Sequence, residues 1–417
     1  MTTQTTHHIP PGYKLTELGV IPVDWEVKKL GDVGNICMCK RIMKYQTKAI
    51  GDVPFYKIGT FGKEADAYID NQIYYDYKRK YPFPKQGEIL ISVSGTIGRT
   101  VIYDGLPAYF QDSNIIWLDN DEKMVSNKFL FYLYKIISWK TEDTTISRLY
   151  NDNFKKTQIC IPPTIEEQQS IATALSDIDT LITSLKDLIS KKQAIKQGMM
   201  QLLLTGKKRL PGFHGERKIK KIIDIGELTG AGVDKKINPD EEFVRLLNYM
   251  DVYRRDFIYS NELNHLVTAP KSKIIQCSVK KGDVFFTPSS ELQNDIAHSA
   301  VAMEDMEQVT YSYHVYRLRT KDERDCKFKA YAFKTQFFYQ QAEKTAEGSG
   351  KRYVISLTKF RQLEIFYPQD IREQQAIATI LSDMDAEIAS LQAQQNKYKN
   401  IKQGMMQQLL TGKIRLI

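Results

Sequence analysis

The feature that most constrains this chain is a long internal repeat. Residues 167–207 read EQQSIATALSDIDTLITSLKDLISKKQAIKQGMMQLLLTGK, and residues 373–413 read EQQAIATILSDMDAEIASLQAQQNKYKNIKQGMMQQLLTGK. The offset is 206 residues without a gap, and 26 of the 41 aligned positions are identical. A repeat of this length predicts two structurally equivalent halves in one polypeptide. It also indicates a target with two related but different parts.

Each copy carries the signals of a helix start. Thr164 and Glu167 fit a capping box, in which Thr164 accepts a hydrogen bond from the backbone of Glu167 and the Glu167 carboxylate reaches back. Asp370 and Glu373 are the corresponding pair in the second copy, with Asp as the cap. Prolines precede both caps and disfavour helical continuation upstream.

Glycines mark two further places in each copy. Gly206 and Gly412 lie where a helix C-cap needs positive φ, next to a lysine at the carbonyl end. Gly198 and Gly404 lie inside an identical IKQGMMQ heptamer, where a helical glycine costs about 1 kcal/mol relative to alanine. These two glycines are either tolerated kinks or points where another backbone approaches closely, in the partner helix or in another subunit.

Between the caps, residues recur at alternating spacings of four and three, as in a coiled-coil seam. The first copy places at these positions Ile171, Leu175, Ile178, Ile182, Leu185, Ile189, Lys192, Lys196, Met199 and Leu203. The second copy places there Ile377, Leu381, Met384, Ile388, Leu391, Gln395, Tyr398, Lys402, Met405 and Leu409. Roughly 40 residues at about 1.5 Å rise per residue give a rod of about 60 Å. The partner that this apolar stripe requires is most simply the other copy, in antiparallel orientation.

The composition limits the class of protein. With 417 residues and 42% hydrophobic content, the chain can bury cores in several domains. A net charge of +9 favours an anionic partner, nucleic acid first and a membrane surface second. The chain has no apolar run of 18 residues and no N-terminal secretory pattern. Its five scattered cysteines are typical of a reducing compartment, so we expect a cytoplasmic protein.

The segments that precede the two repeats resemble each other weakly. Residues 27–34 recur at 219–226, and residues 86–92 recur at 281–287. Both segments alternate short strand and helix patterns, which predicts a mixed α/β (α+β) fold: two strand-rich globular domains joined by two long antiparallel coiled-coil helices. The predicted segments are a first globular domain over 1–163, a first helix over 164–206, a second globular domain over 207–369 and a second helix over 370–412.

Catalytic motifs are missing from the sequence. It contains no phosphate-binding loop, no dinucleotide-binding glycine pattern, no H-E-x-x-H and no G-x-S-x-G. The Asn/Asp-Pro-Pro-aromatic tetrapeptide of amino-methylating enzymes is also absent. Cys37 and Cys39 are too close together for the usual zinc pair. We therefore expect a protein that is not an enzyme and that has no metal site or cofactor of its own.

Two globular domains alternating with two near-identical helices, which begin with EQQxIAxxLSxxD and end with IKQGMMQxLLTGK, resemble the DNA-specificity subunit of type I restriction–modification systems. The opening segment from Tyr13 to Trp25 and the Ser-Gly-Thr-Ile-Gly turn at 94–98 are also similar to that family. The resemblance implies a non-catalytic reader, in which each target recognition domain reads one half of a bipartite, asymmetric site in double-stranded DNA.

The same resemblance implies roles for the helices and for partner proteins. The helices would act as a ruler between the half-sites and would dock two modification subunits. Those subunits would carry S-adenosylmethionine and methylate adenine, and restriction subunits with translocase and nuclease activity would join them. A coiled-coil scaffold whose domains bind proteins is the main alternative, and a self-contained nucleic-acid enzyme is a third hypothesis.

Base edges are read by polar side chains, so we expect DNA contacts in the turns between strands. In the first domain the candidates are Ser92, Ser94, Thr96, Arg99, Gln111, Ser113, Asn114, Arg148 and Asn151. In the second domain they are Thr287, Ser289, Ser290, Gln293, Tyr311, Tyr313, His314, Arg352 and Tyr353. The two sets differ in chemistry, which predicts two different half-sites.

Overall fold

The computed structural model describes most of the chain. The N-terminal residues, on which the expected lack of a secretory signal partly rests, lie outside the described residues. The described ranges are 9–141, 148–214, 217–321 and 325–416.

Contacts divide the described chain into two compact units. Unit 1 comprises Met1–Leu185 with Gln394–Ile417, and unit 2 comprises Lys186–Ala393. Each unit therefore combines one globular part with portions of both long helices. The boundaries predicted for four consecutive segments stay a prediction.

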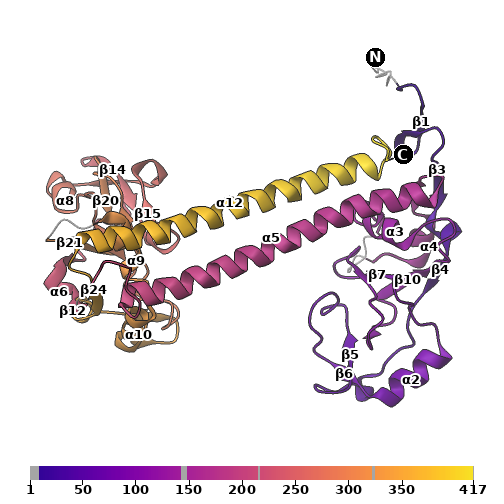
Figure 1. The fold of residues 1–417 in the computed structure, drawn as a ribbon, viewed down its shortest axis with the longest axis horizontal. Coiled ribbons are helices and arrows are strands. Elements are labelled where there is room, and N and C mark those ends of the chain that lie inside the picture. Colours follow the sequence, from indigo (N-terminus) through magenta and orange to yellow (C-terminus); the bar gives the residue numbers. More distant parts are fainter. Residues whose placement is uncertain (1–8, 142–147, 215–216, 322–324, 417) are drawn as a thin grey trace. The chain divides into compact units, whose positions relative to one another are not determined.

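The globular part of unit 1 mixes short strands with short helices (Figure 1). The strands are β1 (Tyr13–Thr16), β2 (Gly19–Pro22), β3 (Glu26–Lys29), β4 (Asn35–Cys37), β5 (Val53–Tyr56), β6 (Tyr68–Ile69), β7 (Ile89–Ser92), β8 (Thr100–Ile102), β9 (Tyr109–Phe110), β10 (Ile115–Asp119) and β11 (Gln158–Ile161). The helices are α1 (Leu30–Val33), α2 (Asn71–Lys80), α3 (Asn127–Leu133) and α4 (Asn151–Lys156). An antiparallel sheet runs in the order β4-β10-β7-β8, and a second sheet, β6-β5-β9, pairs β5 with β9 in parallel.

Strand β7 organises the core of unit 1. Its sequence, Ile-Leu-Ile-Ser, is buried throughout, as expected for a strand covered on both faces. Ile89 and Ile91 pack in a cluster with residues of both long helices, whereas Leu90 packs in a second cluster with the aromatic residues of β5 and β9. The turn at 94–98 joins two paired strands, because β7 pairs with β8 in antiparallel orientation.

The globular part of unit 2 has more elements. The strands are β12 (Lys218–Lys221), β13 (Gly226–Thr229), β14 (Glu242–Leu247), β15 (Phe257–Ile258), β16 (Leu266–Ala269), β17 (Val284–Phe286), β18 (Ser289–Ser290), β19 (Ser299–Ala302), β20 (Val309–Tyr311), β21 (Tyr316–Thr320), β22 (Glu347–Ser349), β23 (Arg352–Val354) and β24 (Glu364–Tyr367). The helices are α6 (Ile222–Ile225), α7 (Tyr249–Tyr253), α8 (Lys271–Gln276), α9 (Cys326–Ala332), α10 (Gln336–Thr345) and α11 (Leu357–Phe360).

The two units share one strand topology. The order β4-β10-β7-β8 in unit 1 corresponds to β13-β21-β17-β19 in unit 2, where β15 extends the sheet. The order β6-β5-β9 corresponds to β16-β14-β20, and each of these sheets contains one parallel pair. The pairs β11–β3 and β24–β12 also correspond. The mixed α/β fold predicted from the sequence is confirmed.

Two of the candidate contact residues, Tyr313 and His314, lie directly before β21, which begins at Tyr316. They lie in a turn, which the backbone N–H of Val315 closes by donating to the carbonyl of Ser312 at 3.0 Å. The turn leaves Tyr313 exposed and His314 half-buried at the surface of unit 2.

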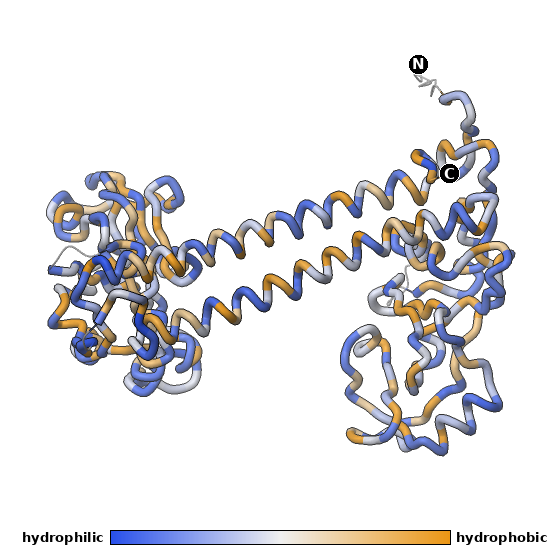
Figure 2. Tube along the Cα trace, viewed as in Figure 1, coloured by the Kyte–Doolittle hydropathy of each residue, from blue (hydrophilic) through white to orange (hydrophobic). Residues whose placement is uncertain are grey.

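The repeated segments form two long helices, α5 (Ile165–Thr205) and α12 (Ile371–Leu409). Within each unit their portions run antiparallel (Figure 1). Every predicted seam position is buried or half-buried, and Figure 2 shows hydrophobic residues recurring along both helices. The antiparallel coiled-coil pairing predicted from the sequence is therefore observed in both units.

Ion pairs occupy the polar positions of the seam. In unit 2, Lys196 pairs with Asp385, which also accepts a hydrogen bond from Tyr331 Oη at 2.7 Å. In unit 1, Lys402 Nζ lies 2.6 Å from Asp179, which accepts from Tyr132 Oη at 3.0 Å. These two triads correspond under the 206-residue offset in their helical members. They explain why lysine interrupts an apolar seam without leaving a charge unpaired.

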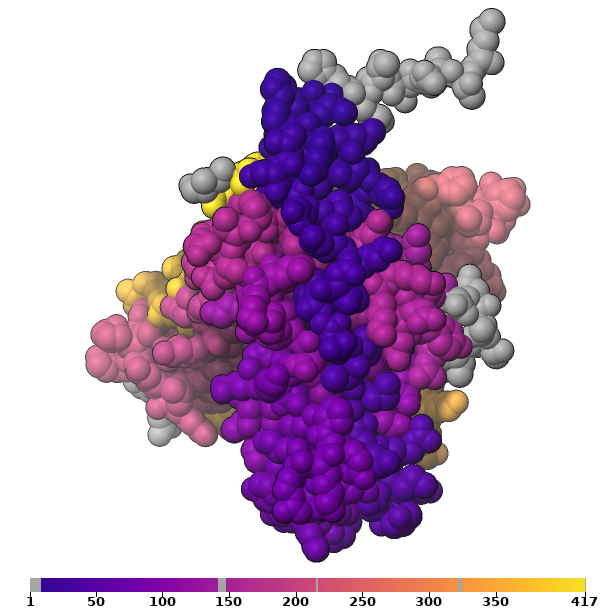
Figure 3. Space-filling view, turned by 90° about the vertical axis from the view of Figure 1, so that its right-hand side faces the viewer, coloured from indigo at the N-terminus to yellow at the C-terminus, as the bar shows by residue number. Residues whose placement is uncertain are grey.

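The helix starts correct one detail of the predicted capping box. Thr164 Oγ1 does accept from the backbone N–H of Glu167, at 3.2 Å. The Glu167 carboxylate does not reach back to the cap; both of its oxygens accept from Arg415, at 2.9 and 2.7 Å. Arg415 also pairs with Asp24 at 2.8 Å, and Figure 3 shows the C-terminal residues beside the N-terminal segment. The glutamate thus binds the end of the other helix of unit 1.

Unit 2 repeats this helix-end ion pair with an additional arginine. Asp370 caps α12 by accepting from the backbone N–H of Arg372 at 2.9 Å. The Glu373 carboxylate accepts from Arg209 at 2.7 and 3.0 Å and from Arg217 at 3.1 Å. Arg209 and Arg415 are equivalent under the repeat offset, so both units join a helix start to a helix end by the same pair.

The helix ends match the prediction from the glycines. Gly206 and Gly412 have φ of 77° and 69°. In both copies a backbone N–H two residues later donates six positions back, from Lys208 to Leu202 and from Ile414 to Gln408, at 3.1 and 3.2 Å. The glycine N–H also donates three positions back, from Gly206 to Leu203 and from Gly412 to Leu409, at 3.4 and 3.2 Å. This closure requires the left-handed conformation that glycine adopts at no steric cost.

The interior glycines face open space. A Cβ added at Gly198 or Gly404 would have no atom within 4 Å among the described residues. Close approach of the other long helix therefore does not explain them. Of the two interpretations left open by the sequence, a tolerated glycine and a contact with another subunit remain.

Candidate nucleic-acid interface

A hydrogen-bonded loop network lies at one edge of the β4-β10-β7-β8 sheet in unit 1. The backbone N–H of Leu149 donates to the carbonyl of Val93 at 2.9 Å, and Ser94 forms an isolated bridge with Arg148. Ser94 Oγ donates to Asn114 Oδ1 at 2.7 Å, and the Arg148 guanidinium donates to the carbonyl of Ser113 at 2.6 Å. The structure therefore brings together candidates from three separate stretches of sequence.

Unit 2 has the corresponding contact. The backbone N–H of Ile355 donates to the carbonyl of Pro288 at 2.9 Å. Strand β18 pairs with β23, with Ser290 opposite Tyr353. In unit 1 the loop after β7 is thus joined to the segment before β11, and in unit 2 the loop after β17 is joined to the segment before β24. The side chains on the two loops differ.

Three of the residues predicted to contact DNA are instead buried in the structure. Ser92 is 2% exposed, and its hydroxyl bridges the Ser94–Gly98 turn by donating to the Thr96 carbonyl at 2.5 Å and accepting from the Arg99 N–H at 3.0 Å. Thr287 is 0% exposed and accepts from the N–H of His298 at 3.0 Å. Tyr311, also 0% exposed, packs against the ring of Phe285. These side chains support the loops and cannot reach a ligand at the surface.

Two further candidates are half-buried and bind backbone atoms. The Arg99 guanidinium donates to the carbonyl of Phe61 at 2.9 Å. Gln111 Oε1 accepts from the backbone N–H of Ile58 at 2.8 Å. Both side chains hold the loop at 57–62 against the sheet.

The remaining candidates lie at or near the surface. Thr96 and Asn151 are exposed in unit 1. Gln293 is exposed in unit 2, where its side chain donates to the Glu343 carbonyl of α10 at 3.0 Å. Tyr313, which is 49% exposed, packs its ring 4.0 Å from that of His314.

An open pocket of about 550 Å³ gathers several of the unit 2 candidates. Ser289, Ser290, His314 and Arg352 line it together with residues that sequence reasoning did not single out. Those additional residues are Tyr249, Met250, Tyr253, Glu291, Leu292 and Asp295, and Lys351, which precedes the candidate Arg352 in the sequence, lines the pocket as well. The spacing of the two tyrosines on α7 was the available signal, because residues four apart share one face of a helix.

The pocket is lined by two cations, Lys351 and Arg352, and by two acids, Glu291 and Asp295. Burial lowers the pKa of His314, and the neighbouring charges of Lys235 and Arg352 lower it further, so the imidazole is held neutral. Lys351 and Arg352 are exposed, and exposed cations attract phosphate.

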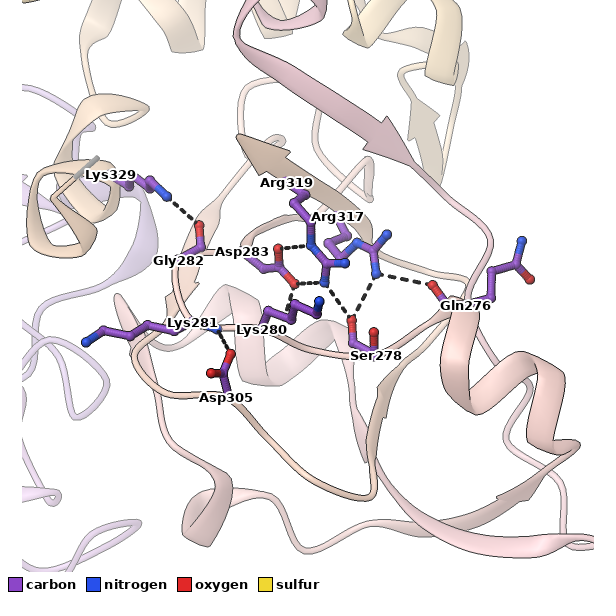
Figure 4. Close-up of polar contacts among 10 residues, drawn as sticks. All are labelled: Gln276, Ser278, Lys280, Lys281, Gly282, Asp283, Asp305, Arg317, Arg319 and Lys329. Atoms are coloured by element: carbon purple, nitrogen blue, oxygen red, sulfur yellow. Dashed lines mark hydrogen bonds and ion pairs between the residues drawn. The ribbon is translucent and has the colours of Figure 1, made fainter. Parts of the chain in front are cut away.

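Other arginines of unit 2 are occupied inside the fold (Figure 4). Arg319 forms a two-point ion pair with Asp283 at 2.8 and 2.6 Å. Arg317 and Arg319 both donate to the carbonyl of Ser278, at 2.9 and 3.0 Å. Arg317 is 4% exposed, so this cluster braces the start of β17 and is not part of the pocket lining.

A basic surface in unit 1 was also not predicted from the sequence. Tyr45 is 84% exposed in a short 3₁₀ helix, η1 (Lys44–Gln46), and Lys40 lies 5.0 Å from the ring centroid of Tyr81. Arg41 pairs with Asp112 at 2.8 Å, directly beside Ser113 of the loop network. The signal was the run of basic and aromatic residues at 40–48.

The described residues contain no group of histidine, cysteine or acidic side chains that could hold a metal ion. All five cysteines are free. No helix in the described part of the chain is long and apolar enough to cross a membrane.

Known proteins identify the family. Residues 22–197 and 215–400 each match the type I restriction modification DNA specificity domain. The chain belongs to this family. Specificity subunits are the non-catalytic DNA-recognition subunits of type I systems, which agrees with the missing catalytic motifs.

Individual specificity subunits are similar to this chain over different lengths. A putative type I restriction enzyme specificity subunit of Haemophilus influenzae is 58% identical over 39% of this chain, but the match covers only 42% of that protein. Two specificity subunits of Methanocaldococcus jannaschii, MjaVIII and a putative MjaX, are 24% and 25% identical over 95% and 97% of this chain and cover 94% and 97% of their own lengths.

Solved structures of specificity subunits share the fold. The S subunit of a type I system from M. genitalium aligns with a TM-score of 0.53 and 15% identity, covering 95% of this chain and 97% of that one. A chain from a study of complex assembly and conformational transition of the type I system aligns with a TM-score of 0.59 and 13% identity, covering 94% and 99%.

Proposed function

We propose that each unit reads one half of a bipartite, asymmetric target in double-stranded DNA. One observation carries this proposal: in both units a hydrogen bond joins the loop after the middle strand of the main sheet to a segment near the end of the globular part. In unit 1 the bond runs from Leu149 to Val93, and in unit 2 it runs from Ile355 to Pro288. The frame is the same, and the side chains that it presents differ. A shared frame with different loops suits two related ligands, such as two half-sequences on one duplex.

The two loop sets offer different chemistry to a base edge. Unit 1 presents Ser94, Thr96 and Asn114, which are neutral groups that donate and accept. Unit 2 presents Ser290, Arg352 and His314 around an open pocket. The net charge of +9 adds the general attraction to phosphate that positions a reader on its site.

We propose further that α5 and α12 set the spacing of the two half-sites and dock two modification subunits, which restriction subunits join. The support is that each helix is continuous over 41 and 39 residues and that its ends are fixed by equivalent ion pairs in the two units. In this proposal residues 1–163 and 207–369 are the target recognition domains.

Mapping adenine methylation in cells with and without this chain tests the reader role. We expect one bipartite motif to disappear on deletion of the chain and to return on complementation. Unchanged methylation at every motif, with the cognate modification subunit expressed, would overturn the proposal.

A matched pair of insertions tests the ruler role. Inserting four residues after Leu188 in α5 and after Gln394 at the equivalent position of α12 adds about 6 Å of helix, or about two base pairs of DNA. We expect a longer spacer and two unchanged half-sequences. The same insertion in the exposed turn at Gly105 is the control and should leave the spacer unchanged. Altered half-sequences with an unaltered spacer would reject the ruler.

A further inference from the structure

The open pocket of unit 2 contains a carboxylate that is held by hydrogen bonds. Asp295 lines the pocket together with a second acid, Glu291, and two cations, Lys351 and Arg352. The Asp295 side chain is 33% exposed. A carboxylate repels phosphate, so Asp295 does not contribute to general attraction to DNA. Its chemistry fits a hydrogen-bond donor instead.

Two neighbours hold this carboxylate in place. His298 Nε2 lies 2.7 Å from Asp295 Oδ1, and Tyr253 Oη donates to Oδ2 at 2.9 Å. The hydrogen bond with Asp295 raises the pKa of Tyr253, so the phenol stays protonated as a donor. A carboxylate has about four acceptor positions, and these two contacts use one on each oxygen. Each oxygen therefore keeps acceptor capacity.

The carboxylate is also connected to the loop that we propose reads DNA. The rings of Tyr253 and Tyr249 stack with centroids 6.0 Å apart and planes 17° apart. Tyr249 Oη donates to the carbonyl of Ser289 in β18 at 2.8 Å. One face of α7 thus links Asp295 to the strand that carries the predicted contact residues. Asp295 itself lies in the segment between β18 and β19, where these hydrogen bonds fix its side chain. A side chain fixed in this way discriminates between ligands better than a mobile surface side chain does.

We propose that Asp295 is a specificity-determining residue of unit 2, which accepts a hydrogen bond from the exocyclic amine of a cytosine or adenine in the major groove. Such amines are the donors that base edges present there, and carboxylates accept from them. The inference rests on the proposed function of unit 2 as a DNA reader. It adds a residue and a direction of hydrogen bonding that the family membership does not supply.

Asp295→Asn tests this inference in the full chain, co-expressed with its modification subunit. The amide has nearly the same shape but carries no charge and presents N–H donors as well as an acceptor. We expect adenine-methylation mapping to show relaxed or changed preference at one base pair of one half-sequence, with the other half unchanged. The preference at that position should fall roughly 5- to 150-fold, the discrimination typical of one base contact.

Matched variants separate recognition from folding. Glu307→Gln neutralises an exposed acid of unit 2 that does not line the pocket and should leave both half-sequences unchanged. Tyr253→Phe removes one hydrogen bond to the carboxylate and should change the same base pair less than Asp295→Asn does. If Asp295→Asn lowers the unfolding midpoint, Asp295→Glu, which keeps the charged acceptor, should retain the original base preference.

Binding to a random-sequence duplex provides the second readout. Asp295→Asn removes a negative charge, so its affinity for that duplex should equal or exceed that of the unmodified chain. A motif that persists unchanged at every position in the Asp295→Asn variant would overturn the inference and leave the reader role of unit 2 standing. If deletion of the whole chain leaves every methylation motif in place, that result would instead overturn the proposed function.

Discussion

In each unit an acidic residue directly precedes the strand at the middle of the main sheet, β7 or β17. The side chain opposite this residue on the neighbouring strand is an acid in unit 1 and an arginine in unit 2. In unit 1, Glu88 precedes β7 and lies close to Asp119 at the end of β10. In unit 2, Asp283 precedes β17 and pairs with Arg319 at the corresponding place on β21. The same backbone therefore supports an acid–arginine pair in unit 2 and, in unit 1, two neighbouring acids of which Asp119 pairs with Lys85 at 2.8 Å. The shared strand topology does not depend on the charges of these side chains. The side chains that would contact a ligand can therefore also differ between the units.

The helix-end ion pairs differ between the units in a way that predicts the largest effect. Glu373→Ala would leave Arg217, whose side chain is 4% exposed, without its charged partner in unit 2. Removing one member of a buried pair costs about 3–5 kcal/mol. Glu167→Ala should cost less, about 1–3 kcal/mol, because Arg415 is more exposed and keeps Asp24.

Urea titration can separate these two losses. All three tryptophans, Trp25, Trp117 and Trp139, belong to unit 1, so tryptophan fluorescence follows unit 1 and circular dichroism follows the whole chain. Glu373→Ala should lower the dichroism midpoint more than the fluorescence midpoint, and Glu167→Ala should do the opposite. Equal losses would show that the extra arginine is not what distinguishes the units.

The acids at the start of β7 predict a pH dependence confined to unit 1. Burial, with Asp119 nearby, raises the pKa of Glu88 from the usual 4.5 to about 7, against the lowering effect of the Lys85 N–H that donates to Oε2 at 2.8 Å. Because the folded state binds this proton more tightly than the unfolded state, the contribution of Glu88 to stability is full below about pH 4.5 and is lost as the pH rises through about 7.

Glu88→Gln should remove this loss and stabilise unit 1 at pH 8 by roughly 2–3 kcal/mol, with little effect at pH 4. Thermal unfolding followed by tryptophan fluorescence across this range provides the measurement. Asp283→Asn is the counterpart, and it should destabilise unit 2 at pH 8 because it deprives Arg319 of its two-point partner. Changes of the same sign in both variants would contradict the electrostatic contrast.

The arginines near the two proposed reading surfaces should also behave differently. Arg352→Ala in unit 2 removes an exposed cation, so we expect the free energy of duplex binding to weaken by about 1–3 kcal/mol. The slope of log affinity against log salt concentration should fall in magnitude by about one. Arg148 in unit 1 instead donates to the Ser113 carbonyl and lies against Tyr150. Arg148→Ala should therefore change recognition of one half-sequence with little change in salt dependence. Fluorescence anisotropy at several salt concentrations measures both.

Arg99→Ala extends the same contrast within unit 1. Because Arg99 binds the carbonyl of Phe61, its loss should loosen the loop at 57–62 and weaken recognition of one half-sequence only. Methylation mapping reports which half is affected. An effect on both halves would show that the loop acts on the whole chain.

The repeat predicted the architecture because it is a regular pattern: the seam, the capping threonine and the C-cap glycines follow from local backbone geometry. Contacts distant in sequence were less accessible. Glu167 has the position of a capping-box residue, and only the fold reveals that Arg415 reaches it. In the same way, Ser92 and Thr287 have the composition of a surface turn. Their burial depends on how the following loop folds back, which no local pattern encodes.

The interior glycines give the smallest predicted effect and bear on what the two units have in common. Gly198→Ala and Gly404→Ala should each stabilise the chain by about 0.5–1 kcal/mol, because both positions are helical, exposed and open to a Cβ. Lys191→Ala on the exposed face of α5 is the control and should change stability little. If the glycines admit the backbone of a modification subunit, the same variants will be more stable alone yet assemble less well with that subunit, as size-exclusion chromatography of the mixture would report. If assembly is unaltered, both glycines are simply tolerated in the helices. The features that the two units share would then be the coiled-coil seam and the helix-end ion pairs.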